Sequence, residues 1–236
     1  MAELPAVADG REVDRILLAR VDPARFRFAV HYDPTRSRKL ADWMDALGAM
    51  LVINGSYYAP DGAAVTPIVS FGKPFGPRGY QARHGAFVVS ADSVGIRDLR
   101  QEDWRSALRN AEHAMVSFPL LVAPDGARPQ SSSLLRAYRS FVGEDADGRI
   151  VVGTTVNASF SLEGFAQFLA SSPLALKYAL NLDGGPLACE GVRIADVTRD
   201  FCGAWEPVTA DPASEQRNPA GKPRPPLPIV LAVTPK

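Results

Sequence analysis

The chain lacks any excess of charge, because 26 lysine and arginine residues balance 26 aspartate and glutamate residues. Without a broad positive field, nothing steers nucleic acid or an anionic membrane surface toward the protein. We therefore expect no nucleic-acid partner, and any anionic ligand must be held by a few local groups. The composition leaves the oligomeric state open.

Cysteine is equally scarce, since only Cys189 and Cys202 occur and no cluster of histidines accompanies them. This scarcity excludes an ordinary four-ligand zinc site, and we expect neither a metal ion nor a cofactor. Two interpretations of the pair remain. The cysteines form one disulfide in an oxidising compartment, or they are two buried free thiols.

Long apolar runs are also missing, and the longest uninterrupted one near the middle of the chain covers only residues 49–53. That is far short of a membrane span, so we expect none. The first ten residues lack the basic and apolar regions of a signal peptide, which read literally indicates a cytosolic protein. If Met1 instead follows a leader that has been removed, the protein is periplasmic or secreted.

What the chain does have is enough apolar sequence for one core, since 46% of its 236 residues are hydrophobic. Residues 1–15 are polar and we interpret them as an irregular N-terminal arm, followed by a single domain over residues 16–236. Strand and turn patterns with a few helices predict a mixed α/β (α+β) domain built on one extensive mixed sheet. The proline-rich stretch after Gly203 predicts a long loop before a final strand at residues 227–233.

Several elements are predicted by local patterns. Strands at residues 16–21 and 26–32 flank a turn and predict an opening hairpin. Apolar residues at helical spacing predict a helix over residues 40–47 that ends at Gly48, and Ser161 begins a second helix. Pro119 interrupts an apolar run at residues 114–122, which marks an edge strand or a bulge.

An apolar strand at residues 178–182 runs directly into Asp183-Gly184-Gly185. Asp-Gly is a strong signal for a tight hairpin turn, and residue types alone favour that interpretation. The alternative is a site in which the glycines let a ligand rest against the main chain beside a carboxylate.

Two further polar residues need an explanation. Arg139 lies within an apolar strand pattern, so it either faces solvent, which is the default, or points into a pocket that supplies an anion. His84 is a lone imidazole in polar surroundings. A surface or hydrogen-bonding role is favoured for it over contact with an anion.

Four motifs in chain order are similar to those of the phosphodiester glycosidase family. They are Asn54-Gly55-Ser-Tyr-Tyr, Ser117-Phe-Pro119 with Asp125-Gly126, Arg139-Ser-Phe-Val-Gly143, and Asn181-Leu-Asp183-Gly184-Gly185. The resemblance covers most of the chain. It implies a pocket at the ends of strands and hydrolysis of the bond between an anomeric carbon and a phosphate in a phosphorylated carbohydrate.

The resemblance also implies catalytic roles for three residues. Asp183 acts as nucleophile or base, Arg139 clamps the phosphate with its planar fork of donors, and Asn54 holds a hydroxyl or a phosphate oxygen. Substrate contacts are implied for a second set of residues. These are Asn181, Gly184, Gly185, Gly55 and His84.

The chain departs from the family pattern after Gly185, where Pro186 and Leu187 stand in place of a third glycine and a serine. Proline removes a backbone N–H that a phosphate accepts from. A non-catalytic module that binds a phosphorylated glycan or a cell-envelope polymer is therefore the alternative function. No second carboxylate is identified, so the sequence leaves open whether the anomeric configuration is retained or inverted.

Overall fold

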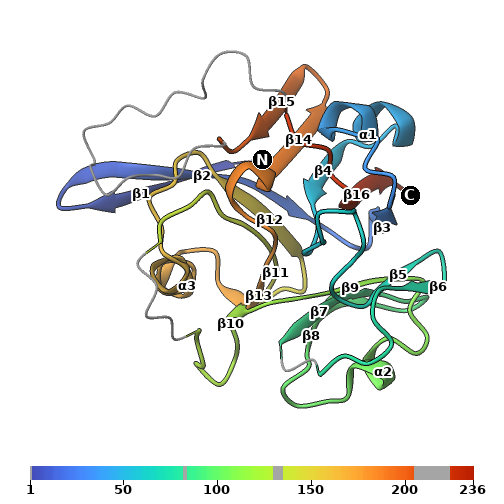
Figure 1. The fold of residues 1–236 in the computed structure, drawn as a ribbon. Coiled ribbons are helices and arrows are strands. Elements are labelled where there is room, and N and C mark those ends of the chain that lie inside the picture. The colour runs from blue at the N-terminus through green and yellow to red at the C-terminus, as the bar shows by residue number, and fades with distance from the viewer. Residues whose placement is uncertain (1, 82–83, 130–134, 205–223) are drawn as a thin grey trace.

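Three antiparallel sheets surround one apolar interior (Figure 1). The computed structural model describes residues 2–81, 84–129, 135–204 and 224–236. The six-stranded sheet contains, in spatial order, β1 (Ala2–Ala8), β2 (Arg11–Val21), β12 (Ile150–Thr155), β11 (Ser140–Asp145), β13 (Leu176–Asn181) and β10 (Leu120–Val122). One five-stranded sheet contains β15 (Val197–Cys202), β14 (Cys189–Ile194), β4 (Leu51–Asn54), β16 (Ile229–Pro235) and β3 (Phe26–Tyr32). The other contains β6 (Lys73–Phe75), β5 (Ile68–Ser70), β9 (His113–Ser117), β7 (Gly85–Val89) and β8 (Val94–Asp98).

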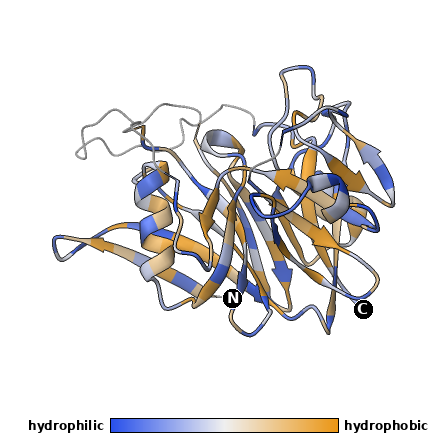
Figure 2. Ribbon diagram, turned by 90° about the horizontal axis from the view of Figure 1, so that it is seen from below, coloured by the Kyte–Doolittle hydropathy of each residue, from blue (hydrophilic) through white to orange (hydrophobic). Residues whose placement is uncertain are grey.

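Successive side chains of a strand point to opposite faces, and the central strands are buried on both faces because their residues are apolar almost throughout. In β4, Leu51 and Ile53 enter the central core, whereas Val52 packs in the cluster on the other face. The same alternation places Leu180 in the central core and Ala179 on the outer face. Hydrophobic colour accordingly predominates on many central strands in Figure 2. Each large side chain buried in this way contributes about 1.5–3 kcal/mol.

One helix covers the outer face of each sheet (Figure 1). These are α1 (Leu40–Leu47), α2 (Trp104–Ala107) and α3 (Leu162–Ser171). The predicted C-terminal end of α1 and the predicted N-terminal start of α3 are confirmed. Gly48 adopts a left-handed conformation at the end of α1, with φ of 56°, and the Ser161 hydroxyl accepts the Gly164 N–H at 3.1 Å.

The predicted single domain of strands with a few helices is confirmed, with three antiparallel sheets in place of one extensive mixed sheet. Proline had the expected effect, because β10 follows Pro119 and is an edge strand. The proline-rich loop falls mainly on residues 205–223, outside the described part of the chain. No described helix is long and apolar enough to cross a bilayer.

The prediction of an irregular arm at residues 1–15 was wrong. Residues 2–8 form β1, which pairs with β2 across a two-residue turn at Asp9 and Gly10, where φ is 50° and 74°. Positive φ at both positions suits a tight hairpin, so Asp-Gly directed the fold here. Most residues of β1 are exposed, including its one charged residue, Glu3.

Two predicted hairpins were also wrong. The turn at residues 22–25 carries the chain from one sheet to another, because β2 pairs with β1 and β12 whereas β3 pairs with β16. Likewise, β13 and β14 belong to different sheets, so Asp183-Gly184 does not close a hairpin. Local turn chemistry was compatible with a hairpin at both points, but burial of each strand against distant partners decided the topology.

The cysteine alternatives are resolved in favour of a disulfide. Cys189 and Cys202 lie directly opposite each other on β14 and β15 and are covalently joined. The bond lies next to the segment that follows Asp183, because Gly203 donates its N–H to the carbonyl of Ala188 at 3.0 Å.

Candidate active site

Arg139 directly precedes β11 and Asp183 follows β13 by two residues, so both lie at the same end of two paired central strands. Phe141 on β11 pairs with Asn181 on β13, and the Leu182 N–H donates to the Ser140 carbonyl at 3.0 Å. Beyond the paired strands the Gly185 N–H donates to the Tyr138 carbonyl at 2.9 Å, so the segments that carry Asp183 and Arg139 stay close. Both residues are therefore attached to the same end of the sheet, and Tyr57 lies within electrostatic reach of both.

The backbone of Asp183 is fixed by three hydrogen bonds from two sheets. Its N–H donates to the Gly55 carbonyl at 3.1 Å. Its carbonyl accepts from the Asn54 amide at 2.8 Å and from the Ser140 hydroxyl at 2.9 Å. The position of the Asp183 side chain is therefore set by the junction between the sheets rather than by a free loop.

The Asp183 carboxyl is half-buried and short of compensating partners. One oxygen accepts the Gly184 N–H at 2.9 Å, and no described basic residue forms an ion pair with it. Burial raises the pKa of Asp183 to about 6, although the Gly184 bond opposes this shift. The group therefore titrates close to neutral pH, as a general base or a nucleophile in an enzyme often does.

Both glycines after Asp183 have a backbone reason to be glycine. A Cβ atom on Gly184 would lie 2.8 Å from the carbonyl oxygen of Tyr138, and Gly185 has φ of 62°. The same Tyr138 carbonyl accepts the Gly185 N–H at 2.9 Å. The glycines thus let this segment pass close to the residue before Arg139, and a direct contact with substrate stays a prediction.

Arg139 is a half-buried cation without a carboxylate partner among the described residues. Its Nε donates to the Phe160 carbonyl at 3.3 Å, and one terminal nitrogen donates to the Leu135 carbonyl at 3.1 Å. Burial lowers the pKa of Arg139, but a guanidinium keeps its charge at neutral pH. Since two carbonyls occupy only part of its five N–H donors, the rest are available to an anion.

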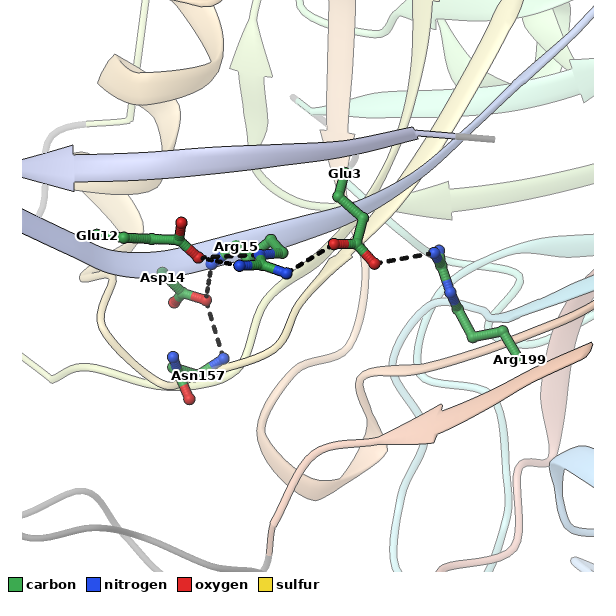
Figure 3. A network of polar contacts seen from close by, with 6 residues as sticks. All are labelled: Glu3, Glu12, Asp14, Arg15, Asn157 and Arg199. Carbon is green, nitrogen blue, oxygen red and sulfur yellow. Dashed lines mark hydrogen bonds and ion pairs between the residues drawn. The ribbon is translucent and has the colours of Figure 1, made fainter.

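A network of polar contacts supports the loop that reaches Phe160 (Figure 3). The Asp14 carboxylate is 1% exposed and accepts the backbone N–H groups of Asn157 at 2.9 Å and Ser159 at 3.3 Å. Burial raises the pKa of Asp14 to about 6, against the effect of these bonds. The carbonyl that orients Arg139 is therefore held through a buried carboxylate on β2.

The same figure shows how this region is tied to the edge of the fold. Arg15 bridges Glu12 and Glu3, each at 2.8 Å, and Glu3 lies 3.5 Å from Arg199 on β15 (Figure 3). Exposed pairs of this kind contribute little individually, on the order of 0–1 kcal/mol each. Their effect is to keep the β1–β2 hairpin beside β15.

Asn54 and Gly55 lie directly behind Asp183. Asn54 is 2% exposed, and its side-chain oxygen accepts the Cys189 N–H at 3.0 Å while its nitrogen donates to Asp183. Gly55 faces β16, where an added Cβ would lie 2.3 Å from a methyl carbon of Ile229. The contacts of both residues are to the protein itself, and their predicted contacts with substrate remain untested.

Asn181 and His84 are joined to the site through two aromatic residues. The Asn181 amide donates to the Tyr57 hydroxyl at 2.6 Å, and that hydroxyl donates to the Phe118 carbonyl at 2.9 Å. The rings of Tyr57 and Phe118 are stacked with centroids 4.4 Å apart, and the His84 ring lies 5.0 Å from Phe118. The side-chain oxygen of Asn181 is buried without a hydrogen-bond partner.

Tyr57 was missed as a candidate site residue, although the two tyrosines after Asn54-Gly55 are a visible signal. Burial and the nearby Asp183 carboxylate raise the pKa of Tyr57 to about 12, while Asn181 and Arg139 act in the opposite direction. Tyr57 therefore lies within the electrostatic reach of both candidate catalytic groups and stays neutral. Its contacts with Asn181 and Phe118 became apparent only in the fold.

A resident metal has no evident place in the described part of the chain. No group of three or more histidine, cysteine, aspartate or glutamate side chains is arranged there to hold an ion. A carboxyl with a raised pKa and a guanidinium without an ion pair to any described residue lie at the same end of the sheet, and this arrangement is suited to chemistry on an anionic substrate.

Comparisons with known proteins place this geometry in context. Residues 47–188 match the family model described as phosphodiester glycosidase. This range includes Asn54, Arg139 and Asp183. No curated protein sequence gives a match.

Solved structures share the fold at low sequence identity. The catalytic domain of zebrafish N-acetylglucosamine-1-phosphodiester alpha-N-acetylglucosaminidase, auto-inhibited by its pro-peptide, superposes with a TM-score of 0.62 at 16% identity, over 100% of this chain and 88% of that one. A hypothetical protein from Synechocystis has a TM-score of 0.60 at 15% identity, over 99% of this chain and 61% of that one. At these identities the likeness shows the fold alone.

Proposed function

Because the chain belongs to the phosphodiester glycosidase family, we propose that it hydrolyses the glycosidic bond of a sugar-1-phosphodiester. One observation carries the proposal. A half-buried guanidinium with no acidic partner in the described part of the chain is attached at the same sheet end as a half-buried carboxyl whose pKa is about 6. A sugar-1-phosphodiester carries one negative charge, which would pair with Arg139. It also has an anomeric carbon on which Asp183 would act.

Arg139 binds the phosphate in this proposal. Its free N–H donors reach two oxygens of the diester, and they stabilise the charge that collects on the leaving phosphate as its bond to the anomeric carbon breaks. The Phe160 and Leu135 carbonyls hold the fork in place before substrate arrives, so little reorganisation is needed.

Asp183 acts in its ionised form. It either attacks the anomeric carbon directly, which forms a glycosyl ester that water then hydrolyses, or removes a proton from a water molecule that attacks this carbon. In both cases the phosphate monoester leaves and a free sugar is released. The phosphate is a good leaving group, so the reaction depends less on a second acid than cleavage of an ordinary glycoside does. The stereochemical outcome depends on which of these two roles Asp183 takes.

Other residues support these two in the proposal. Asn54 and Gly55 position Asp183 by holding its backbone. Tyr57 and Phe118 present a stacked pair of rings to the sugar, with His84 at the far side of Phe118. Asn181 keeps the Tyr57 hydroxyl in place, while Gly184 and Gly185 let the sugar approach the main chain.

A product assay tests the proposal. The protein is incubated with a methyl diester of a sugar-1-phosphate, and released reducing sugar is measured for the parent, Asp183→Asn and Arg139→Gln. We expect release by the parent alone, with both variants folded as judged by circular dichroism. Release by Asp183→Asn at the parent rate would disprove the assigned role.

A non-catalytic binding module is the second candidate, and Pro186 favours it. Pro186 lies in the short helical turn of residues Gly185–Leu187 and offers no N–H to a phosphate. Calorimetry beside the product assay separates the two functions. Heat of binding with no reducing sugar released by the parent would favour the module.

The disulfide bears on where the protein works. Disulfides persist in oxidising compartments and are rare in the cytosol of most organisms. Because Cys189 and Cys202 are bonded, the proposed location is the periplasm or the exterior of the cell. Thiol counting on protein isolated from its native source, with free thiols blocked at lysis, tests this assignment.

A further inference from the structure

A second concave surface lies away from the candidate active site, beside the hairpin of β5 and β6. It encloses about 380 Å³ between this hairpin, β3 and α1. Its chemically distinctive lining residues are His31, Arg38, Trp43, Phe71, Lys73 and Phe75. None of the candidate active-site residues lines it.

Phe71 occupies a position that its own backbone disfavours. It begins the two-residue turn between Ser70 and Lys73, with φ of 51°, where glycine, asparagine or aspartate is usual. Holding a bulky residue there costs roughly 1–2 kcal/mol. The side chain recovers little by burial, because it is 62% exposed. Neither local structure nor the core explains a phenylalanine at this point.

The exposed ring is nevertheless held in place. It lies edge-on to His113, with centroids 4.7 Å apart, and to His31 at 5.3 Å. Phe75, which is 38% exposed, lies edge-on to Tyr32 at 5.2 Å. The hairpin thus presents two partly exposed rings whose orientations are set by the rings beneath them.

The charged residues that line this groove are the cations Arg38 and Lys73, whereas Asp92 and Glu112 line the larger groove that Phe71 also borders, so anionic groups of a ligand are confined to the smaller groove. Arg38 lies over the Trp43 ring at 4.8 Å, and Lys73 makes no ion pair with any described residue. No carboxylate is among the described residues that line this groove, although Asp33 lies 3.9 Å from Arg38 just outside it. Burial, with the charges of His113 and Arg38, lowers the pKa of His31 to about 4, so His31 is neutral near pH 7 and adds hydrogen-bonding capacity.

The groove continues into a larger one of about 790 Å³ between β3 and the β7–β8 hairpin. The two share His31, Leu47 and Phe71 as lining residues. A ligand that follows both is therefore extended. Exposed rings suit the C–H faces of sugars, and the two cations suit phosphate groups.

We propose that this surface is a secondary binding site for a phosphorylated glycan chain, with Phe71 and Phe75 against sugar rings and with Arg38 and Lys73 on phosphates. The choice of a phosphorylated sugar rests on the proposed function, whereas the need for an extended anion with flat faces rests on the groove alone. His113 contacts Phe71 at one end of β9, and Ser117 lies near Asn181 at the other end. These ends are roughly 13 Å apart, so the secondary site holds units remote from the bond that is cleaved.

Calorimetry on the full chain tests this proposal. An Asp183→Asn background prevents turnover, and the probe is a mannose oligosaccharide joined by phosphodiesters. Phe71→Asn and the double variant Arg38→Gln/Lys73→Gln are compared within that background, so any binding at the active site is common to all samples. We expect each change to weaken binding by at least about tenfold. Unchanged affinity in Phe71→Asn would overturn the proposal.

Phe71→Asn also separates binding from structure. Asparagine accepts positive φ more readily than phenylalanine, so the variant should unfold at the same or a higher temperature. With Asp183 restored, it should hydrolyse a small sugar phosphodiester at the parent rate. Lower stability with unchanged affinity would mean that Phe71 serves packing alone. Equal affinity for the unphosphorylated oligosaccharide, or tighter binding of single-stranded DNA, would also contradict the assignment.

The outcomes distinguish this inference from the proposed function. A parent protein that releases no sugar but binds the oligosaccharide through Phe71 supports the secondary site and refutes hydrolysis. If the parent hydrolyses small diesters and no groove variant changes the affinity for the oligosaccharide, the proposed hydrolysis is supported and the secondary site is refuted.

Discussion

Replacing Asp183 with asparagine should make the protein more stable at neutral pH. The unfolded carboxyl loses its proton near pH 3.8, whereas the folded one holds it to about pH 6. Between these values the folded state binds more protons than the unfolded state, so the stability of the parent falls as pH rises through this window. The loss is about 3 kcal/mol for a shift of roughly two units, and it persists at higher pH.

Asparagine removes this loss and keeps the local hydrogen bond. Its side-chain oxygen still accepts the Gly184 N–H, which Asp183 accepts at 2.9 Å. The variant should therefore gain up to about 3 kcal/mol over the parent near pH 7.5, or about 6–12 °C in Tm for a chain of this size. Near pH 3.5 the difference should vanish, because the parent carboxyl is then largely protonated in both states.

Thermal and urea unfolding at several pH values between about 3.5 and 7.5 measures the difference directly. Asp14 also has a raised pKa, but it is common to both proteins and cancels in the comparison. A variant that is no more stable than the parent at pH 7.5 would refute the reasoning that burial of the Asp183 charge is costly. So would a gain that is independent of pH.

Further predictions concern the same site. Arg139→Lys keeps the positive charge but loses the planar fork of donors, so kcat/KM on a sugar phosphodiester should fall about 10²–10³-fold while the free energy of unfolding stays unchanged. A variant with the kcat/KM of the parent would contradict the proposed binding of phosphate by Arg139. The parent kcat/KM should rise with pH through about 6 as the Asp183 pKa is passed, and a profile without that ascending limb would argue against Asp183 as the ionised group. Asn54→Ala leaves the buried Cys189 N–H without its partner, while the Asp183 carbonyl keeps the Ser140 hydroxyl. The free energy of unfolding should fall by about 1–3 kcal/mol, measured by urea unfolding; a cost below about 1 kcal/mol would mean that water replaces the amide. Replacing Cys189 and Cys202 with serine should lower stability by about 2–4 kcal/mol, and a variant as stable as the parent would show that the sheet pairing alone suffices.

The elements that sequence predicted well are those decided by local patterns. The helix over residues 40–47 follows from apolar spacing and a terminal glycine, and both are visible in the letters. The final strand follows from an apolar run that is buried on both faces. Such features need no knowledge of distant partners.

Strand partners were a different matter. Strand β2 is followed directly by β3 along the chain, yet the two enter different sheets because their apolar faces are completed by β12 and β16. The number of residues between them permitted a hairpin, and only packing over long sequence separations excluded it. Strand β1 failed for another reason, since its apolar residues do not alternate with polar ones and most of them are exposed.

In the candidate site, too, residues that stand out in a local pattern were predicted, and contacts between distant residues were not. Arg139 and Asp183 stand out as charges within apolar strand patterns, and their motifs assigned them together before any geometry was known. Tyr57 did not stand out, because its contact with Asn181 joins residues that are far apart in the chain. The internal role of the Asn54 amide was likewise invisible, since an amide at a strand end is as compatible with a ligand as with the backbone.

The Asn54 amide bonds at once to Asp183, which follows a strand of the six-stranded sheet, and to Cys189 at the start of a strand in another. The proposed hydrolysis therefore requires that both sheets have docked, because the residue assigned to it is held by both. We expect a partly assembled chain to be inert toward a sugar phosphodiester, however complete either half is. An activity assay would then serve as a sensitive gauge of the correct folding of the whole molecule.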